Sequence, residues 1–135
     1  MQEFNVLLVD DEEPYCGIIA DVLIWAYNLN VLIAHSASEA QSLLNNNEIH
    51  LILLDVMMPE MDGLSLARWI RSEPDHSGIP IVVISAKASP TDRKLAIKAG
   101  ANGFLAKPFS SKELQVAIHP YILGKVKTRN ISQGH

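Results

Sequence analysis

The sequence has a single cysteine, no long apolar run and no excess of basic residues. Cys16 cannot form a disulfide within the chain, so it is expected to be a buried bystander. No apolar segment reaches the roughly 18 residues needed to span a bilayer, and the N-terminus lacks the basic-then-apolar layout of a signal peptide. The formal charge is −4 at pH 7, which provides no basic surface for non-specific nucleic-acid binding. These absences predict a soluble cytoplasmic protein that contacts neither membrane nor nucleic acid.

What the sequence does contain is an ordinary globular balance. Hydrophobic residues make up 48% of the 135 positions and charged residues 19%, which argues against disorder. This length has room for one domain with a single core. Residues 125–135 lack apolar periodicity, so we expect a domain over residues 1–124 followed by a tail or the start of a linker.

Five short apolar runs alternate with five segments of helical length. The runs predict strands buried on both faces of a sheet, at residues 5–9, 30–34, 51–54, 79–84 and 102–106. The longer segments predict helices over residues 14–28, 38–46, 63–72, 90–99 and 110–123. Such alternation favours right-handed crossovers and an α/β fold, with an open parallel sheet between two layers of helices.

Capping residues support the helix boundaries. Ser38 is expected to cap the second helix, and Ser110 with Glu113 forms the pattern of a capping box at the start of the fifth. The fourth helix lies between Pro90 and Gly100, which matches the usual placement of proline at a helix start and glycine after its end.

The first predicted helix is more apolar than one buried face requires. Its main stripe contains Ile18, Ile19, Val22, Leu23 and Ala26. Four further apolar or aromatic residues lie off that stripe, namely Tyr15, Ile24, Trp25 and Tyr27. Extra packing against the last helix and a partner surface both remain open as explanations.

Polar residues follow four of the five predicted strands. Asp10 and Asp11 follow the first, Asp55 the third, Ser85 the fourth and Lys107 the fifth. Ligands of parallel sheets bind beyond the carboxyl ends of the strands, so these side chains are expected to meet at one edge.

Three carboxylates at one edge need a cation, because like charges a few ångströms apart repel strongly. Oxygen ligands at an open site suit Mg²⁺, and Lys107 would add a fixed positive charge. A carboxylate between a divalent metal and an ammonium is a plausible acceptor for a phosphoryl group.

Four motifs resemble the CheY-like receiver domains of response regulators in two-component phosphorelay signalling. They are VDDE at residues 9–12, LDVMMPEMDG at 54–63, SA at 85–86 and KPF at 107–109. Each is weak alone, but the four occur in order, and the likeness covers about residues 4–123. It implies a flavodoxin-like (βα)5 three-layer sandwich whose parallel sheet has the strand order 2-1-3-4-5.

The resemblance also implies a role for each site residue. Asp55 would accept the phosphoryl group, and Lys107, in a cis bond with Pro108, would contact the phosphoryl oxygens. Ser85 would donate its hydroxyl to the same group, in place of the threonine of many relatives, and Phe104 would be the switch aromatic. Mg²⁺ would be bound by Asp55, by Asp11 directly, by Asp10 through water and by the backbone carbonyl of Met57.

By the same resemblance the chain would be a signalling domain that assists its own phosphorylation and dephosphorylation, rather than an enzyme with a separate substrate. Its donor would be a sensor histidine kinase or a histidine phosphotransfer protein. Its surface of fourth helix, fifth strand and fifth helix would signal to an unknown effector. It would be a monomer or a weak, phosphorylation-dependent dimer. Whether it stands alone or belongs to a longer protein is left open.

Simpler interpretations exist for each residue taken singly. Asp10 and Asp11 could cap the first helix, Asp55 could be a turn residue, and Lys107 could be a solvated surface lysine. Asp62 and the glycine after it indicate only a turn and a helix entry. Met57, Met58 and Met61 are expected in packing or loops, because thioether sulfur is a poor Mg²⁺ ligand.

Three rival functions share parts of this pattern. A haloacid dehalogenase-type phosphatase would need a second aspartate two residues after Asp55, where this chain has Met57. A flavodoxin-like cofactor binder would need a phosphate-cradling loop after the first strand, where this chain has Asp-Asp-Glu-Glu. A pseudo-receiver would keep the fold as a docking module without phosphorylation.

Overall fold

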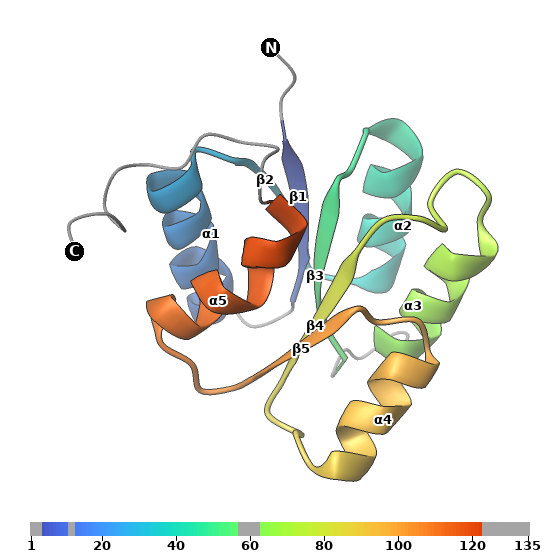
Figure 1. Cartoon of the computed structure of the whole chain (residues 1–135). Coiled ribbons are helices and arrows are strands. Elements are labelled where there is room, and N and C mark those ends of the chain that lie inside the picture. The colour runs from blue at the N-terminus through green and yellow to red at the C-terminus, as the bar shows by residue number, and fades with distance from the viewer. Residues whose placement is uncertain (1–3, 11–12, 57–62, 123–135) are drawn as a thin grey trace.

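A five-stranded parallel sheet lies between two layers of helices in the computed structural model (Figure 1). The structure describes residues 4–10, 13–56 and 63–122. Its elements, in chain order, are β1 Asn5–Val9, α1 Glu13–Tyr27, β2 Asn30–Ala34, α2 Ala37–Asn46, β3 Leu51–Asp55, α3 Gly63–Ser72, β4 Ile81–Ser85, α4 Pro90–Lys98, β5 Gly103–Ala106 and α5 Ser111–Ile122. The strand order β2-β1-β3-β4-β5 confirms the predicted flavodoxin-like fold.

The sheet has an apolar core on each face. Helices α1 and α5 cover one face, and α2, α3 and α4 cover the other (Figure 1). Alternate strand residues point to opposite faces, so Leu51 and Leu53 of β3 pack toward α1 and α5, whereas Ile52 and Leu54 pack toward the other layer. Every residue of β3 and β4 is buried, which explains why both strands are apolar without alternation.

Most predicted boundaries agree with the structure to within one residue, and two helix or strand starts differ for local reasons. Strand β4 begins at Ile81 rather than at residue 79, because the Ile79 amide donates to the carbonyl of His76 and so belongs to the preceding turn. Helix α2 is capped by Ser36, not by Ser38: the Ser36 side chain accepts a hydrogen bond from the Glu39 amide.

Other local predictions were confirmed. Ser110 and Glu113 form the reciprocal hydrogen bonds of a capping box at the start of α5. The Lys107–Pro108 peptide bond is cis. Cys16 is buried. The predicted tail, residues 125–135, lies outside the described part of the chain and stays a prediction.

Helix α1 has exposed apolar residues, as the sequence suggested. Which of its apolar residues are buried and which are exposed differs in part from the prediction. Ile19, Leu23 and Ala26 are buried as expected, whereas Ile18 of the predicted stripe is 56% exposed. Tyr27 is buried, while Ile24 and Trp25 are exposed. Among the described residues, no helix is both long and apolar enough to cross a membrane.

Candidate functional site

Strand register brings the predicted polar residues to one edge of the sheet. Val9 pairs with Leu54, so Asp10 and Asp55 follow neighbouring positions of β1 and β3. Asp55 in turn pairs with Ile84, which places Ser85 one residue further along β4. Ser85 pairs with Ala106, and Lys107 is the next residue in the chain. All four side chains therefore start from the carboxyl edge.

Lys107 joins two of the predicted carboxylates. Its Nζ donates to Oδ2 of Asp10 at 3.2 Å and to Oδ2 of Asp55 at 3.3 Å. The three side chains are almost fully buried, with exposures of 4% for Lys107, 1% for Asp10 and 2% for Asp55. Lys107 is therefore not a solvated surface lysine. Buried ions require partners of opposite charge, and among the described residues the Lys107 ammonium is such a partner for both Asp10 and Asp55.

The backbone of Asp10 is held by two neighbouring segments, the end of β2 and helix α1. Its amide donates to the carbonyl of Ala34 at the end of β2. Its carbonyl accepts a hydrogen bond from the Cys16 thiol at 3.3 Å, and Nδ1 of His35 lies 3.1 Å from the same oxygen. Neither Cys16 nor His35 could be assigned to the site from the sequence, because both contact a backbone atom.

Ser85 is completely buried and connects the site to the loop that follows β4. Its hydroxyl oxygen accepts a hydrogen bond from the Lys87 amide at 3.0 Å. Its carbonyl accepts from the Lys107 amide at 2.9 Å. The Ser85 hydroxyl is therefore in direct contact with the β4–α4 loop.

The start of α4 links this loop to Phe104. Ser89 and Asp92 form a capping box, and the hydrogen bond from the Ser89 side chain lowers the pKa of the Asp92 carboxyl. Arg93 donates from Nε to the carbonyl of Ala88, and its guanidinium carbon lies 4.8 Å from the centre of the Phe104 ring. Arg93 had not been assigned to the site from the sequence.

An aromatic pair stands next to Lys107. The ammonium nitrogen lies 4.3 Å from the centre of the Tyr15 ring, which comes from the first turn of α1. Tyr15 in turn contacts Phe109, with ring centres 5.8 Å apart. Tyr15 had been noted in the sequence only as an aromatic residue off the main helical stripe.

The family of this chain follows from a comparison of its sequence with family models. The model of the response regulator receiver domain matches residues 6–119, which include all the described site residues. The chain belongs to the receiver domain family.

Several curated relatives of this receiver domain carry the names of regulatory proteins. The chain is 40% identical over 106 residues to a gliding motility regulatory protein of Myxococcus xanthus, covering 78% of this chain and 14% of that protein. It is 35% identical over 114 residues to the transcriptional regulatory protein GltR of Pseudomonas aeruginosa, covering 84% of this chain and 47% of that protein. It is also 35% identical over 130 residues to the probable transcriptional regulator ycf27 of Cyanidium caldarium, covering 96% of this chain and 50% of that protein. The receiver domain thus spans half or less of these relatives.

Solved structures share the fold over nearly their whole length. A putative response regulator from Chloroflexus aurantiacus has a TM-score of 0.84 at 29% identity, covering 90% of this chain and 98% of that one. The chemotaxis protein CheY4 of Vibrio cholerae has a TM-score of 0.80 at 27% identity, covering 85% of this chain and 95% of that one. The receiver fold therefore accounts for all five strands.

Gly63 of this receiver domain packs against the predicted acceptor strand. It begins α3, as predicted, and its amide donates to the carbonyl of Val56 at 2.9 Å. A Cβ atom at this position would lie 2.3 Å from Cα of Val56 and 2.5 Å from the carbonyl oxygen of Asp55. Only glycine fits without displacing the backbone that carries Asp55. The sequence had indicated a turn here but not this close approach.

Receiver domains in general bind Mg²⁺ at an acidic pocket, and the donors described here suit that ion. Asp10 and Asp55 offer buried carboxylate oxygens, which are ligands that Mg²⁺ prefers. No group of three or more His, Cys, Asp or Glu side chains is placed to hold a metal within residues 4–10, 13–56 and 63–122. The other two predicted ligands, Asp11 and Met57, lie outside those residues.

Proposed function

We propose that this chain is a phosphorylation-operated switch in which Asp55 accepts a phosphoryl group in a Mg²⁺-dependent reaction. The observation that carries the proposal is the buried contact of Lys107 with Asp55 and Asp10 at the carboxyl edge of the sheet. A carboxylate held in this way faces a cation that can also neutralise the oxygens of an incoming phosphoryl group. Membership of the receiver family supports the same chemistry.

The transfer itself is a displacement at phosphorus. A carboxylate oxygen of Asp55 forms a bond to phosphorus while the bond from phosphorus to the donor's histidine nitrogen breaks, and the nitrogen keeps the electron pair. Lys107 then donates to a phosphoryl oxygen, and the Ser85 hydroxyl donates to another. The donor is a sensor histidine kinase or a histidine phosphotransfer protein, and later attack by water returns Asp55 to its free form.

The metal ligands in this proposal are Asp10, Asp11, Asp55 and Met57. Asp11 would bind Mg²⁺ directly, Asp10 through a coordinated water, and Met57 through its backbone carbonyl. When bound, Mg²⁺ would neutralise charge on the phosphoryl oxygens. The residues described near the site carry two carboxylates for one ammonium, and this negative balance favours a divalent cation.

Acetyl phosphate provides the test of this function, because it donates a phosphoryl group without a kinase. Incubation with Mg²⁺ should add the mass of one phosphoryl group to the intact chain, and EDTA should prevent the gain. The adduct should hydrolyse at alkaline pH, since an acyl phosphate is labile. A chain that stays unmodified with Mg²⁺ present would instead be a pseudo-receiver that signals by docking alone.

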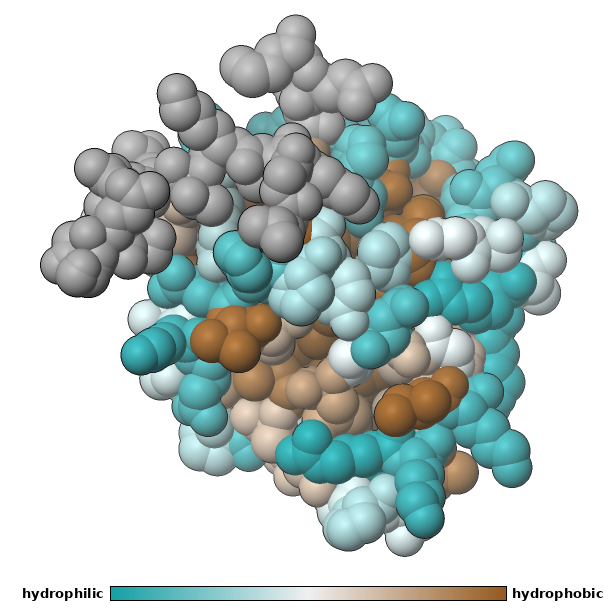
Figure 2. Space-filling model, in the orientation of Figure 1, coloured by the Kyte–Doolittle hydropathy of each residue, from teal (hydrophilic) through white to brown (hydrophobic). Residues whose placement is uncertain are grey.

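Phosphorylation is further proposed to change the surface formed by α4, β5 and α5. Recruitment of the Ser85 hydroxyl by the phosphoryl group would weaken its contact with the Lys87 amide, and Phe104 would turn inward. That turn would separate Phe104 from Arg93. Figure 2 shows apolar surface near the centre of this view with polar side chains around it. Exposed apolar side chains of the two helices are Leu95 and Ile97 of α4 and Val116 of α5.

Amide exchange with and without beryllium fluoride, a phosphoryl mimic, tests the switch. Protection should change over residues 86–104 and stay constant in β1 and β3. The mimic can shift the population only by its differential affinity for the two conformations. Equal protection at residues 86–104 with the mimic bound at saturation would contradict the switch.

The partners of the chain belong to the same proposal. We expect an effector to bind the α4–β5–α5 surface after phosphorylation, with the domain itself contacting no nucleic acid or membrane. We also expect the protein to be located in the cytoplasm and to be a monomer or a weak, phosphorylation-dependent dimer. The regulatory names of the relatives support a signalling role, and the remainder of each of those proteins lies beyond the region that this chain matches.

A further inference from the structure

The Tyr15 ring covers the ammonium group of Lys107. The nitrogen lies over the ring face, 4.3 Å from its centre, and the lysine side chain is only 4% exposed. Tyr15 itself is half-buried and lies in the first turn of α1, on the side of the helix that faces the site. A cation over an aromatic face is attracted by the negative potential of the ring, most strongly where water is excluded.

Phe109 holds the Tyr15 ring in place. The two rings are 5.8 Å apart and tilted by 43°, and both pack against the core that α1 and α5 share. Since Phe109 follows Lys107 by two residues, the same short segment provides both the lysine and the support for its aromatic partner. The Phe109 contact therefore supports the ring in its position over the ammonium.

Charge alone does not fix Lys107 in every state of the site. Asp10 and Asp55 hold the ammonium in the structure, but both are also the proposed metal ligands. A divalent cation on these carboxylates would repel the ammonium and weaken their attraction for it. The ring carries no net charge and binds no Mg²⁺, so its attraction for Lys107 persists.

We propose that Tyr15 is a positioning residue for phosphoryl transfer, which holds the Lys107 ammonium at the acceptor through the face of its ring. This inference rests on the proposed function of Asp55. It assigns a role to the ring and none to the phenol hydroxyl, which distinguishes it from a hydrogen-bonding role. It also makes the effect of Tyr15 depend on the presence of Lys107.

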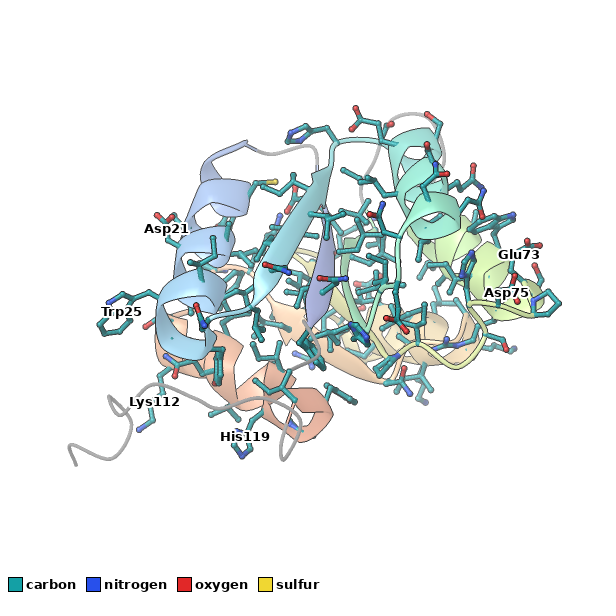
Figure 3. The ribbon with its side chains drawn as sticks, turned by 90° about the horizontal axis from the view of Figure 1, so that it is seen from above. Asp21, Trp25, Glu73, Asp75, Lys112 and His119 are labelled. Atoms are coloured by element: carbon teal, nitrogen blue, oxygen red, sulfur yellow. The ribbon has the colours of Figure 1, made fainter. Side chains whose placement is uncertain are left out.

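Three variants separate these roles. Tyr15→Phe keeps the ring, Tyr15→Leu replaces it by an aliphatic group, and Trp25→Leu makes a similar change elsewhere on α1. Trp25 is 59% exposed and projects away from the sheet, as Figure 3 shows, so it is a matched control. If Tyr15→Leu fails to fold, Tyr15→Met supplies a longer side chain of the same apolar class.

The first readout is the initial rate of modification by acetyl phosphate at saturating Mg²⁺. Tyr15→Leu should be slower by about threefold to thirtyfold, as expected for loss of a partly desolvated cation–π contact. Tyr15→Phe should restore the rate to near that of the native chain, and Trp25→Leu should match the native chain. In a Lys107→Met background, Tyr15→Leu should cause no further slowing.

The second readout needs neither metal nor phosphoryl donor. The side-chain NMR signals of Lys107 should be displaced by the ring current of Tyr15, and this displacement should persist in Tyr15→Phe and disappear in Tyr15→Leu. Adding Mg²⁺ should leave the displacement in place. A native chain that gains no phosphoryl group would refute the proposed function, whereas this readout would still report on the contact.

Several outcomes would overturn the inference. Equal rates for Tyr15→Leu and the native chain would show that the ring does not act. Slowing of Tyr15→Phe to the level of Tyr15→Leu would assign the effect to the hydroxyl. Slowing by Tyr15→Leu that persists in full without Lys107, or equal slowing by Trp25→Leu, would indicate a general effect on α1 instead.

Discussion

The Asp55→Asn variant should gain no phosphoryl group under conditions that modify the native chain. The amide has nearly the shape of the carboxylate but lacks its nucleophilic oxygen, so the chemistry is removed while the packing at the end of β3 is kept. Asp10 still provides a carboxylate for Lys107, so the buried ammonium retains an ionic partner. Intact-mass measurement after incubation with acetyl phosphate and Mg²⁺ checks this expectation.

A matched control for Asp55→Asn is Asp75→Asn. Asp75 is an exposed acid that follows α3, on the opposite side of the molecule from α1 and α5 in Figure 3. The substitution makes the same change in charge, and its phosphorylation should equal that of the native chain. A labile phosphoryl adduct on Asp55→Asn would mean that a different side chain is the acceptor.

The Lys107→Met variant should be defective in both stability and phosphorylation. Removal of the ammonium leaves the buried carboxylates of Asp10 and Asp55 without this counter-charge. Breaking a buried ion pair by removing one partner costs about 3–5 kcal/mol, although proton uptake by a carboxylate would reduce that cost. Phosphorylation should slow about 100-fold or more, the usual result of removing a donor that stabilises transition-state charge.

Mg²⁺ should compensate for part of the stability loss in Lys107→Met. The metal supplies positive charge to the same carboxylates, so it should raise the free energy of unfolding more in Lys107→Met than in the native chain. Urea denaturation with and without Mg²⁺ measures this difference. Lys112→Met, at an exposed position on α5, is the control. Equal stability of the two variants without metal would contradict the role of Lys107 as counter-ion.

The sequence was sufficient to predict the parallel sheet and the polar residues that meet at its carboxyl edge. Buried parallel strands leave a strong signal, because both of their faces must be apolar, and the residues after them share one edge. This placed Asp10, Asp55, Ser85 and Lys107 in their correct strands, and the first two do contact Lys107. The family resemblance added the strand order and the cis bond before Pro108.

Contacts that depend on side-chain direction could not be predicted in the same way. The Tyr15 ring contacts Lys107, and the Arg93 guanidinium contacts the Phe104 ring. Neither contact produces a periodic pattern in the sequence. Ile18 was expected to be buried because it was assigned to the apolar stripe together with Ile19, yet a helix turns by about 100° per residue and this turn carries Ile18 outward. The requirement for glycine at position 63 arises because the start of α3 lies very close to the end of β3, and this distance is known only from the packed structure.

Complete burial of β3 and β4 makes these two strands the most stable part of the protein, in contrast to the helices and loops around them. Backbone amides in such central strands exchange with solvent only through the rarest, near-global openings, whereas helices and loops at the periphery open locally at lower cost. Asp55, the proposed acceptor, therefore stands on the part of the chain least able to deform. On the proposed function, phosphorylation at Asp55 would therefore act through the loops and side chains that border it. Sequence changes in α4 or α5 can then alter the receiving partner while the chemistry at the strand ends stays constant.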